Sequence, residues 1–374
     1  MENLNELEKT IATKKSRAAN IESLLEITVD RGASDLHLIV GTYPTLRIDG
    51  RLTPLSDQFL LTKEIVEELI FAMLNEEQKE VFLKEKELDF SIGLEDRGRF
   101  RVNVFYQRGT LGAALRLIPQ KIRTIEELGL PSICEDFTKP SQGFVLVTGP
   151  TGHGKSTTLA AMVDRVNQEK ACHIITVEDP IEYIHTSKKA IVDQRELHLD
   201  THSWGIALRS VLREDPDVVL IGEMRDLETI SAAITIAETG HLVFATLHTN
   251  NAAQTVDRII DVFPPRQQPQ IRMQLAGSLL GVISQRLLPR IGGGRILASE
   301  LMVATSAVRN IIREGKTHQI DNIIQTSGEA GMILIDASLA YLVKAGRVTL
   351  DTARSYSIRP EELVRIVETG EDYS

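Results

Sequence analysis

The sequence predicts an α/β protein, in which a core of parallel strands and crossover helices follows a smaller α+β domain. In the second region, short runs of nearly continuous apolar residues recur, as expected for strands buried on both faces of a parallel sheet. Segments long enough for crossover helices separate these runs, which favours a doubly wound arrangement. A glycine-rich loop directly follows the first run. The runs are FVLVT (144–148), HIITV (173–177), DVVLI (217–221) and HLVFAT (241–246).

The first region has the alternating patterns of an antiparallel sheet. Apolar residues at helical spacing predict a helix over 21–29, which Gly32 ends. The Asp49-Gly50 pair lies between two short alternating runs and predicts a hairpin, because a type I′ turn needs positive φ at both central residues. A second helix is expected over 62–83, and further strands are expected in LHLIVG, FRVNVFYQ and LGAALRLIP.

These patterns divide the chain into four parts. An N-terminal extension (1–20) precedes the α+β domain (21–118), and a proline-punctuated linker (119–142) leads to the α/β domain (143–374). After Pro264-Pro265 the α/β domain is expected to be mostly helical, with a flexible turn at the three consecutive glycines that begin at Gly292.

Composition argues against several classes of protein. The 374 residues contain no apolar run near the roughly 20 that span a bilayer, and the polar N-terminus lacks the core of a secretory signal, so a cytosolic location is expected. The two isolated cysteines, Cys134 and Cys172, indicate neither disulfides nor zinc and are expected to be buried. A net charge of -10 disfavours nucleic acid as a partner, although a basic channel can lie inside an acidic ring.

The glycine-rich loop fits the phosphate-binding pattern GxxxxGK[ST] between a strand and a helix. Backbone N–H groups of such a loop surround the phosphates, a lysine adds a positive charge and a hydroxyl ligates Mg²⁺. The sequence therefore predicts binding of ATP and Mg²⁺. His153 is open to two interpretations, an exposed loop residue or a pH-sensitive contact near the phosphates. The predicted binding residues are Gly149, Pro150, Thr151, Gly152, His153, Gly154, Lys155, Ser156 and Thr157.

Two acidic positions at the ends of predicted strands are candidates for acting on water and metal. Glu178-Asp179 closes one strand, and Glu223 follows another, with Gly222 where an aspartate usually precedes it. Carboxylates at the carboxyl ends of parallel strands gather beside a bound ligand. We therefore predict Glu223 as the base or water-orienting residue and Glu178 as the acid on the metal side, with Ser156 as its partner ligand.

Histidines and arginines supply candidate phosphate contacts. His241 and His248 bracket the fourth predicted core strand, and each is either structural or a sensor of the γ-phosphate. Arg99 and Arg101 alternate on one predicted strand, and Arg116 lies on the next. These arginines form either a solvated sheet surface or fingers that reach a neighbouring subunit's phosphates.

Taken together, the motifs resemble the secretion ATPase superfamily that drives type II secretion and type IV pili. GPTGHGKST, VEDPIEYIH, DVVLIGEMRD and AETGHLVFATLHT match its Walker A, Asp box, Walker B and His box in order, and the resemblance covers roughly residues 21–350. The short chain, its two cysteines and AVRNIIREGKTHQI (307–320) are most similar to the retraction ATPases of twitching motility. The family uses a small residue where this chain has His153.

This resemblance implies a RecA-like ATPase core, a PAS-like N-terminal domain and a homohexameric ring. It implies Lys155, Glu178 and Glu223 as catalytic residues, His241 and His248 as the His-box pair, and Arg99, Arg101 and Arg116 as arginine contributors. The implied function is pilus retraction at the cytoplasmic face of the inner membrane, with a platform protein and the pilins as partners. The alternatives are an extension or type II secretion motor, a nucleic-acid translocase, and a regulatory subunit that barely hydrolyses ATP.

Overall fold

The computed structural model divides the chain into two compact units, Met1–Gln120 and Lys121–Ser374, and each is described by itself. The structure describes residues 20–48, 50–94, 97–118 and 121–369. The predicted N-terminal extension lies outside this part of the chain except for Asn20, whose side chain caps the first helix by accepting from the Glu22 N–H at 2.9 Å. None of the helices in the described ranges is long and apolar enough to cross a membrane.

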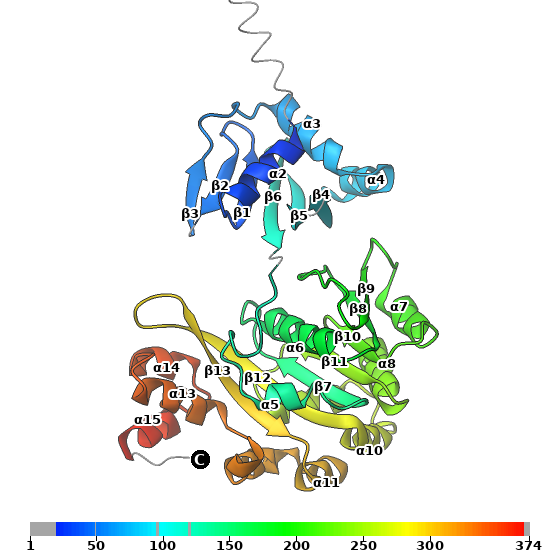
Figure 1. Cartoon of the computed structure of the whole chain (residues 1–374), viewed down its shortest axis with the longest axis vertical. Helices are drawn as coiled ribbons and strands as arrows, with labels where there is room; N and C mark the ends of the chain where they lie inside the picture. The colour runs from blue at the N-terminus through cyan, green and yellow to red at the C-terminus, as the bar shows by residue number, and fades with distance from the viewer. Residues whose placement is uncertain (1–19, 49, 95–96, 119–120, 370–374) are drawn as a thin grey trace, which may run out of the picture. The chain divides into compact units, whose positions relative to one another are not determined.

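The first unit is built on a six-stranded antiparallel sheet with strand order β3-β2-β1-β6-β5-β4 (Figure 1). The predicted hairpin is present, since Ile48 of β2 pairs with Arg51 of β3. Of its turn residues, Gly50 has the expected positive φ of 80°, whereas Asp49 lies outside the described residues. The strands are β1 (Asp35–Ile39), β2 (Thr45–Ile48), β3 (Arg51–Pro54), β4 (Glu87–Leu94), β5 (Gly98–Gln107) and β6 (Thr110–Ile118).

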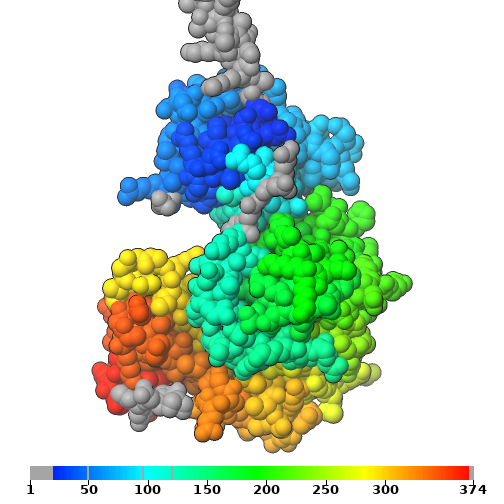
Figure 2. All heavy atoms as spheres, viewed as in Figure 1, coloured from blue at the N-terminus to red at the C-terminus, as the bar shows by residue number. Residues whose placement is uncertain are grey.

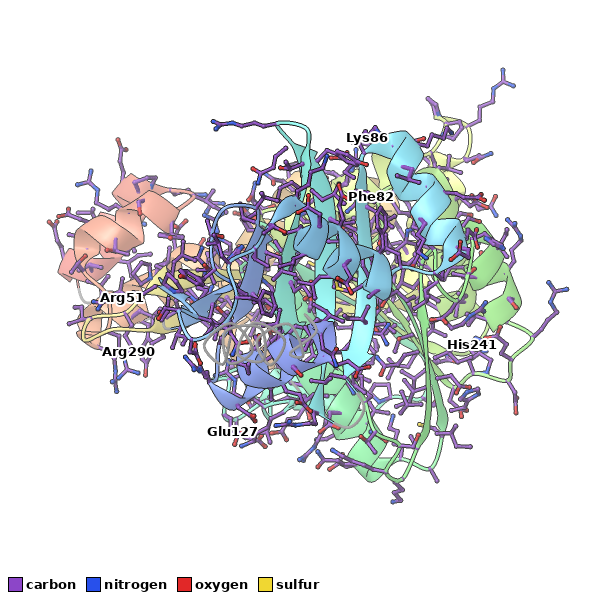
Figure 3. All side chains as sticks on the ribbon, turned by 90° about the horizontal axis from the view of Figure 1, so that it is seen from above. Arg51, Phe82, Lys86, Glu127, His241 and Arg290 are labelled. Carbon is purple, nitrogen blue, oxygen red and sulfur yellow. The ribbon has the colours of Figure 1, made fainter. Side chains whose placement is uncertain are left out.

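Helices α2 (Ile21–Asp30), α3 (Lys63–Met73) and α4 (Glu76–Glu85) pack their apolar residues into the core of this unit. The single helix expected over 62–83 is wrong, because Asn75 starts a new helix through a capping box with Gln78. Helix α4 carries the buried Phe82 and ends at Lys86 in the left-handed region (Figure 3). Strand β4 begins at the next residue, so no turn motif separates it from α4, and the sequence analysis did not predict this strand.

The second unit contains a seven-stranded sheet with strand order β13-β12-β7-β11-β10-β8-β9. Its strands pair in parallel except β13, which is antiparallel to β12. The four predicted core strands are therefore confirmed in a largely parallel sheet, and β9 was missed. The strands are β7 (Gly143–Thr148), β8 (His173–Glu178), β9 (Ile191–Glu196), β10 (Val218–Ile221), β11 (Leu242–Leu247), β12 (Leu279–Pro289) and β13 (Arg295–Val303).

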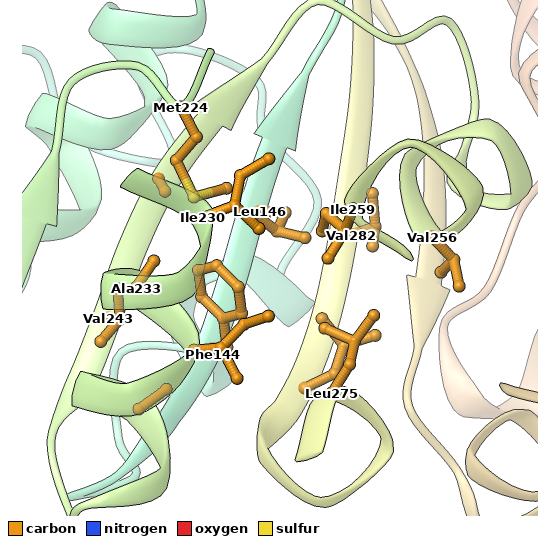
Figure 4. Close-up of a cluster of buried hydrophobic side chains, with 14 of the residues drawn as sticks. Phe144, Leu146, Met224, Ile230, Ala233, Val243, Val256, Ile259, Leu275 and Val282 are labelled. Atoms are coloured by element: carbon orange, nitrogen blue, oxygen red, sulfur yellow. The ribbon is translucent and has the colours of Figure 1, made fainter. Parts of the chain in front are cut away.

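Continuous apolar runs form these strands because helices cover both faces of the sheet. Phe144 and Leu146 of β7 belong to one buried cluster (Figure 4), whereas the alternating Val145 and Val147 belong to another on the opposite face. The helices are α5 (Ile133–Asp136), α6 (Lys155–Glu169), α7 (Trp204–Val211), α8 (Leu227–Glu238), α9 (Ala252–Asp261), α10 (Gln268–Ser278), α11 (Ser306–Glu314), α12 (Ile320–Gln325), α13 (Ile335–Lys344), α14 (Leu350–Tyr356) and α15 (Pro360–Thr369).

The expectation of a mostly helical chain after Pro264-Pro265 needs a correction, because β12 and β13 form a long hairpin within it. Both strands are largely buried, so they lack the alternation of polar and apolar residues that indicates a strand with one exposed face. The predicted glycine turn lies at the tip of this hairpin, where Gly292, Gly293 and Gly294 all have positive φ. Figure 2 shows this tip (yellow) beside the C-terminal helices (orange).

Residues 121–142, predicted as a linker, contribute to the core of the second unit. Ile125, Leu130 and Phe137 are buried in the same cluster as β7. The contact is tight, since a Cβ on Gly281 of β12 would lie 2.2 Å from the Phe137 ring. Cys134 is buried here, and burial raises the pKa of its thiol to about 12, whereas Cys172 is only partly buried.

The segment AVRNIIRE forms helix α11 and has a packing role. Val308, Ile311 and Ile312 are buried against the core of the unit. Arg309 donates through Nη1 to the carbonyl oxygen of Gly277 at 2.7 Å and through Nε to that of Ala304 at 2.8 Å. This arginine therefore caps the C-terminal end of α10, where helix carbonyl groups lack partners.

Candidate nucleotide-binding site

The phosphate-binding loop connects strand β7 to helix α6, as its sequence pattern predicts. Gly149, Gly152 and Gly154 have φ values of 138°, 79° and 84°, which side chains with a Cβ rarely adopt. These conformations let the loop turn sharply into the helix, so that its backbone N–H groups and the positive end of α6 face one point.

Strand β12 packs directly against the phosphate-binding loop. A Cβ on Gly149 would lie 2.4 Å from the Gln285 carbonyl oxygen, so only glycine fits this approach. The Gln285 side chain donates through Nε2 to the His153 carbonyl oxygen at 2.7 Å and accepts through Oε1 from the Thr158 hydroxyl at 2.9 Å. Gln285 therefore fixes both the loop and the first turn of α6.

Substituting alanine at Gly149 is expected to weaken ADP binding strongly. The new methyl group must displace the backbone of β12, and such overpacking costs typically about 1–3 kcal/mol, or roughly 5- to 150-fold in affinity. Gly152→Ala is the matched control, because Gly152 also has positive φ but a Cβ there would meet nothing within 4 Å. Calorimetric titration with ADP compares them, and equal affinity of both variants would contradict this account.

Lys155 begins helix α6 and is buried at the loop. Its Nζ donates to the carbonyl oxygens of Gly149 at 2.9 Å and Pro150 at 3.1 Å, and lies 3.5 Å from Nδ1 of His248. Burial lowers the pKa of Lys155, while the charges of Glu223 and Glu182 act against that shift. The lysine charge therefore lies at the loop, where it would meet phosphates, within reach of the charges of Glu223 and Glu182.

Glu223 lies in direct contact with His248, next to Lys155. Its Oε1 is 3.0 Å from Nε2 of His248, and its Oε2 accepts from the Arg225 guanidinium at 2.8 Å. Burial favours the protonated form, but the bond from Arg225 and the charges of His248, Arg225 and Lys155 lower the pKa of Glu223. Glu223 is thus a carboxylate at neutral pH, which suits it to orient and polarise an attacking water.

Glu178 has a different environment. Its Oε1 accepts from the Thr176 hydroxyl at 2.7 Å and from Gln194 Nε2 at 3.2 Å, and burial raises the pKa of Glu178 to about 7. A Cβ on Gly222 would lie 3.2 Å from the Glu178 Cα, which explains the glycine where an aspartate is usual. Its metal role stays a prediction. The exposed Glu182, whose charge acts on Lys155, is a second candidate that sequence analysis missed.

The two predicted histidines lie at opposite ends of strand β11. His248 follows the strand at the end that carries the phosphate loop on the neighbouring β7, whereas His241 precedes it. The His241 ring lies 2.9 Å from the Ile236 carbonyl oxygen at the end of α8 (His241 is labelled in Figure 3). The structure therefore brings only His248 to Lys155 and Glu223, and a nucleotide role for His241 stays a prediction.

The three predicted arginines lie in the first unit. Arg101 of β5 is directly opposite Arg116 of β6, and its side chain is exposed. Arg116 donates through Nε to Asp35 at 2.9 Å, and Arg99 donates to the Ser91 hydroxyl. Although burial opposes it, the bonds from Ser34 and Arg116 lower the pKa of Asp35, so this ion pair is present at neutral pH. A role in a neighbour's site stays a prediction for all three.

Across the described ranges, no group of three or more His, Cys, Asp or Glu side chains could hold a metal ion by itself.

Comparison with known proteins decides the family. The model of the family "Type II/IV secretion system protein" matches residues 13–352. The chain belongs to this family. It is 49% identical to the type IV pilus retraction ATPase PilT of Pseudomonas aeruginosa, over 91% of this chain and 99% of that protein. It is 45% identical to a twitching motility protein of Neisseria gonorrhoeae, over 92% of each chain. The crystal structure titled as the pilus retraction motor PilT with bound ADP superimposes with a TM-score of 0.87 and 48% identity, covering 92% of this chain and 99% of that one.

As a member of the type II/IV secretion system family, the chain is a nucleotide-binding ATPase. Its phosphate loop, Lys155, Glu223 and His248 meet at one edge of the sheet, so the motif order read from the sequence corresponds to one site. Sequence analysis missed Gln285 and Tyr183, whose hydroxyl lies 2.8 Å from that of Thr157. The polar SQR within the apolar run LLGVISQRLLP was the available signal for Gln285.

Proposed function

We propose that this ATPase is a homohexameric motor that drives retraction of type IV pili. The observation that carries the proposal is the contact series Lys155–His248–Glu223 beside the phosphate loop, in a chain so similar to a retraction ATPase. The α11 segment AVRNIIRE favours retraction over extension or type II secretion. By family likeness, the motor works at the cytoplasmic face of the inner membrane, with a platform protein and the pilins as partners.

The chemistry follows from the contacts of these residues. Phosphates of ATP bind the N–H groups of the loop, and Lys155 exchanges its carbonyl partners for phosphate oxygens. Glu223 then holds the attacking water, and His248 connects that carboxylate to Lys155. Loss of the γ-phosphate changes the charge that this contact series balances, and the strand ends carrying Glu223 and His248 shift in response.

Mg²⁺ fits the residues beside the loop. Ser156 would supply a hydroxyl from the first turn of α6, and a carboxylate would come from Glu178 at the end of β8 or from Glu182 in the segment after it. Bound there with ATP, the ion neutralises negative charge on the phosphates. Glu182 is the better placed of the two acids, since the Glu178 carboxylate is already held by Thr176 and Gln194.

In the ring, we assign Arg101 as the arginine that acts on a neighbour's nucleotide. Arg116 and Arg99 are hydrogen-bonded to side chains of their own unit, and Arg101 is, like Arg116, exposed to solvent. Arg101→Ala is expected to lower hydrolysis at saturating ATP by about 10³-fold, the lower end of known arginine-finger effects. Arg51→Ala, an exposed arginine on the edge strand β3 (Figure 3), is the matched control and keeps full activity.

A mixing experiment tests whether the site is shared. Arg101→Ala and Glu223→Gln each hydrolyse ATP only slowly alone. A random 1:1 mixture regains activity at about a quarter of its interfaces, where each subunit supplies what the other lacks. A mixture as inactive as the two variants would contradict action between subunits.

The motor proposal itself is tested by the Mg²⁺-dependent hydrolysis rate per subunit as a function of protein concentration. A ring with shared sites gives a rate that rises steeply with concentration, together with a hexamer in light scattering. A flat rate from a monomer would overturn the proposal. Single-stranded DNA is added in parallel, and strong stimulation by it would favour the nucleic-acid translocase instead.

A further inference from the structure

His153 differs from the other loop residues in how it is held. The sequence left it open as an exposed residue or a contact near the phosphates, but its ring is half-buried against β12 and α14. Nδ1 of His153 accepts from the Leu287 backbone N–H at 3.0 Å, and the ring centroid lies 6.1 Å from that of Tyr356. The side chain therefore points toward β12 and the C-terminal helices.

The hydrogen bond to Leu287 fixes the state of the ring. A backbone N–H can only donate, so Nδ1 must be unprotonated and the proton of a neutral ring must be on Nε2. Protonation of Nδ1 would remove this acceptor and leave the Leu287 N–H without its partner. It would also place a positive charge near Arg286 of β12, Lys155 of α6 and Arg295 of β13. Burial, together with these three charges, lowers the pKa of His153.

The same strand ties the loop to the C-terminal helices. Arg286, next to Leu287, donates to the Tyr356 carbonyl oxygen at the end of α14, and Arg295 donates to the Gly152 carbonyl oxygen at 3.3 Å. Helices α13, α14 and α15 share a separate buried cluster with Leu288 of β12. His153 thus lies where the phosphate loop, the β12–β13 hairpin and the C-terminal helices meet.

We propose that His153 is a positioning residue of the nucleotide site, which holds the phosphate-binding loop on β12 and makes nucleotide affinity depend on the position of helix α14. Its partners are this chain's own Leu287 and Tyr356. The inference rests on the proposed nucleotide site but needs no ring, pilus or hydrolysis.

Binding of a fluorescent ADP analogue, N-methylanthraniloyl-ADP, to the full chain tests the proposal. His153→Ala removes the acceptor for the Leu287 N–H and is expected to weaken binding about five- to tenfold at pH 8, the worth of one hydrogen bond. His153→Asn places an oxygen near the position of Nδ1 but lacks the ring that contacts Tyr356, so it is expected to bind more tightly than His153→Ala and about twofold more weakly than the wild type. His202→Asn, at an exposed histidine on the same unit, is the matched control.

The pH profile separates positioning from a general loss of structure. As the pH falls from 8 to below the lowered pKa of His153, the wild type is expected to lose affinity that His153→Asn, which cannot titrate there, keeps. Comparison of the two variants cancels the titration of the nucleotide itself and of Glu178. Identical pH profiles would overturn the proposal, as would wild-type affinity of His153→Ala.

Tyr356→Ala provides a second measurement that does not depend on whether His153→Ala folds. Tyr356→Ala is expected to weaken binding of the analogue at least twofold in the wild type and to have no further effect when combined with His153→Asn or His153→Ala, because contacting residues are not additive. Additive effects would overturn the coupling through His153. Failure of the motor proposal would instead show as normal binding without hydrolysis or pilus retraction.

Discussion

Replacement of Glu223 by glutamine is expected to lower the rate of ATP hydrolysis by roughly 10²- to 10³-fold, with ADP affinity within a few-fold of the wild-type value. Glutamine has the same size and can still contact Arg225 and His248, but it has no carboxylate charge to polarise water. Phosphate release under saturating ATP and calorimetric titration with ADP measure the two quantities separately.

Comparison of Glu178→Gln with Glu223→Gln tests which of the two carboxylates ATP hydrolysis depends on more. The Glu178 carboxylate accepts bonds from Thr176 and Gln194 and has a raised pKa, so glutamine is expected to reduce hydrolysis less than tenfold. A loss as large as that of Glu223→Gln would instead support Glu178 as the metal-side acid. Full activity of Glu223→Gln would contradict its role in the reaction.

Removal of the Glu300 carboxylate is expected to lower the free energy of unfolding by about 3 kcal/mol. Glu300 is only 2% exposed, and its two oxygens accept from the Ala252 N–H at 2.8 Å and the Ile335 N–H at 3.4 Å. It therefore joins the first turns of α9 and α13 to strand β13. Urea unfolding of Glu300→Ala measures the loss, with the exposed Glu329→Ala as matched control. Equal stability of the two variants would contradict this role.

The same residue makes stability depend on pH. Burial raises the pKa of Glu300 to about 7 from an ordinary value of 4.5, so the folded state binds the proton more tightly than the unfolded state. The contribution of Glu300 to the free energy of unfolding is complete below pH 4.5 and decreases as the pH rises through 7. Glu300→Gln cannot titrate at this position. From pH 5 to pH 8, the wild type is therefore expected to lose stability relative to this variant. A constant difference would contradict the raised pKa.

The sequence predicted the parts of the fold whose local signals agree with their environment. The strands β7, β8, β10 and β11 are apolar runs buried on both faces, and their loops carry the glycines and carboxylates that gather at one edge. It failed where neighbouring segments decide the structure. Strand β9 lies at the edge of the sheet and has mixed polarity. The sequences of β12 and β13 have no clear alternation, so they cannot be told from a buried helix without knowing that the two strands pair.

For the candidate site, too, the sequence could predict the positions of some residues and not of others. Motif spacing predicted that Lys155 and Glu223 lie close together, because both come after strands of one parallel sheet, whose carboxyl ends share an edge. It could not place His241, since bracketing a strand puts two residues at opposite ends of the sheet. Nor could it show that His153 turns toward Leu287 and Tyr356, because these partners are more than a hundred residues away in the chain.

Pilus retraction in the cells that carry this protein tests the central claim most directly. The chromosomal copy is replaced by the Glu223→Gln variant, and labelled pili are followed by fluorescence microscopy. A retraction motor predicts that pili still assemble and extend but no longer shorten, so that surface pili accumulate. Loss of assembled pili, with the variant present at wild-type levels, would contradict the account and assign the chain to extension.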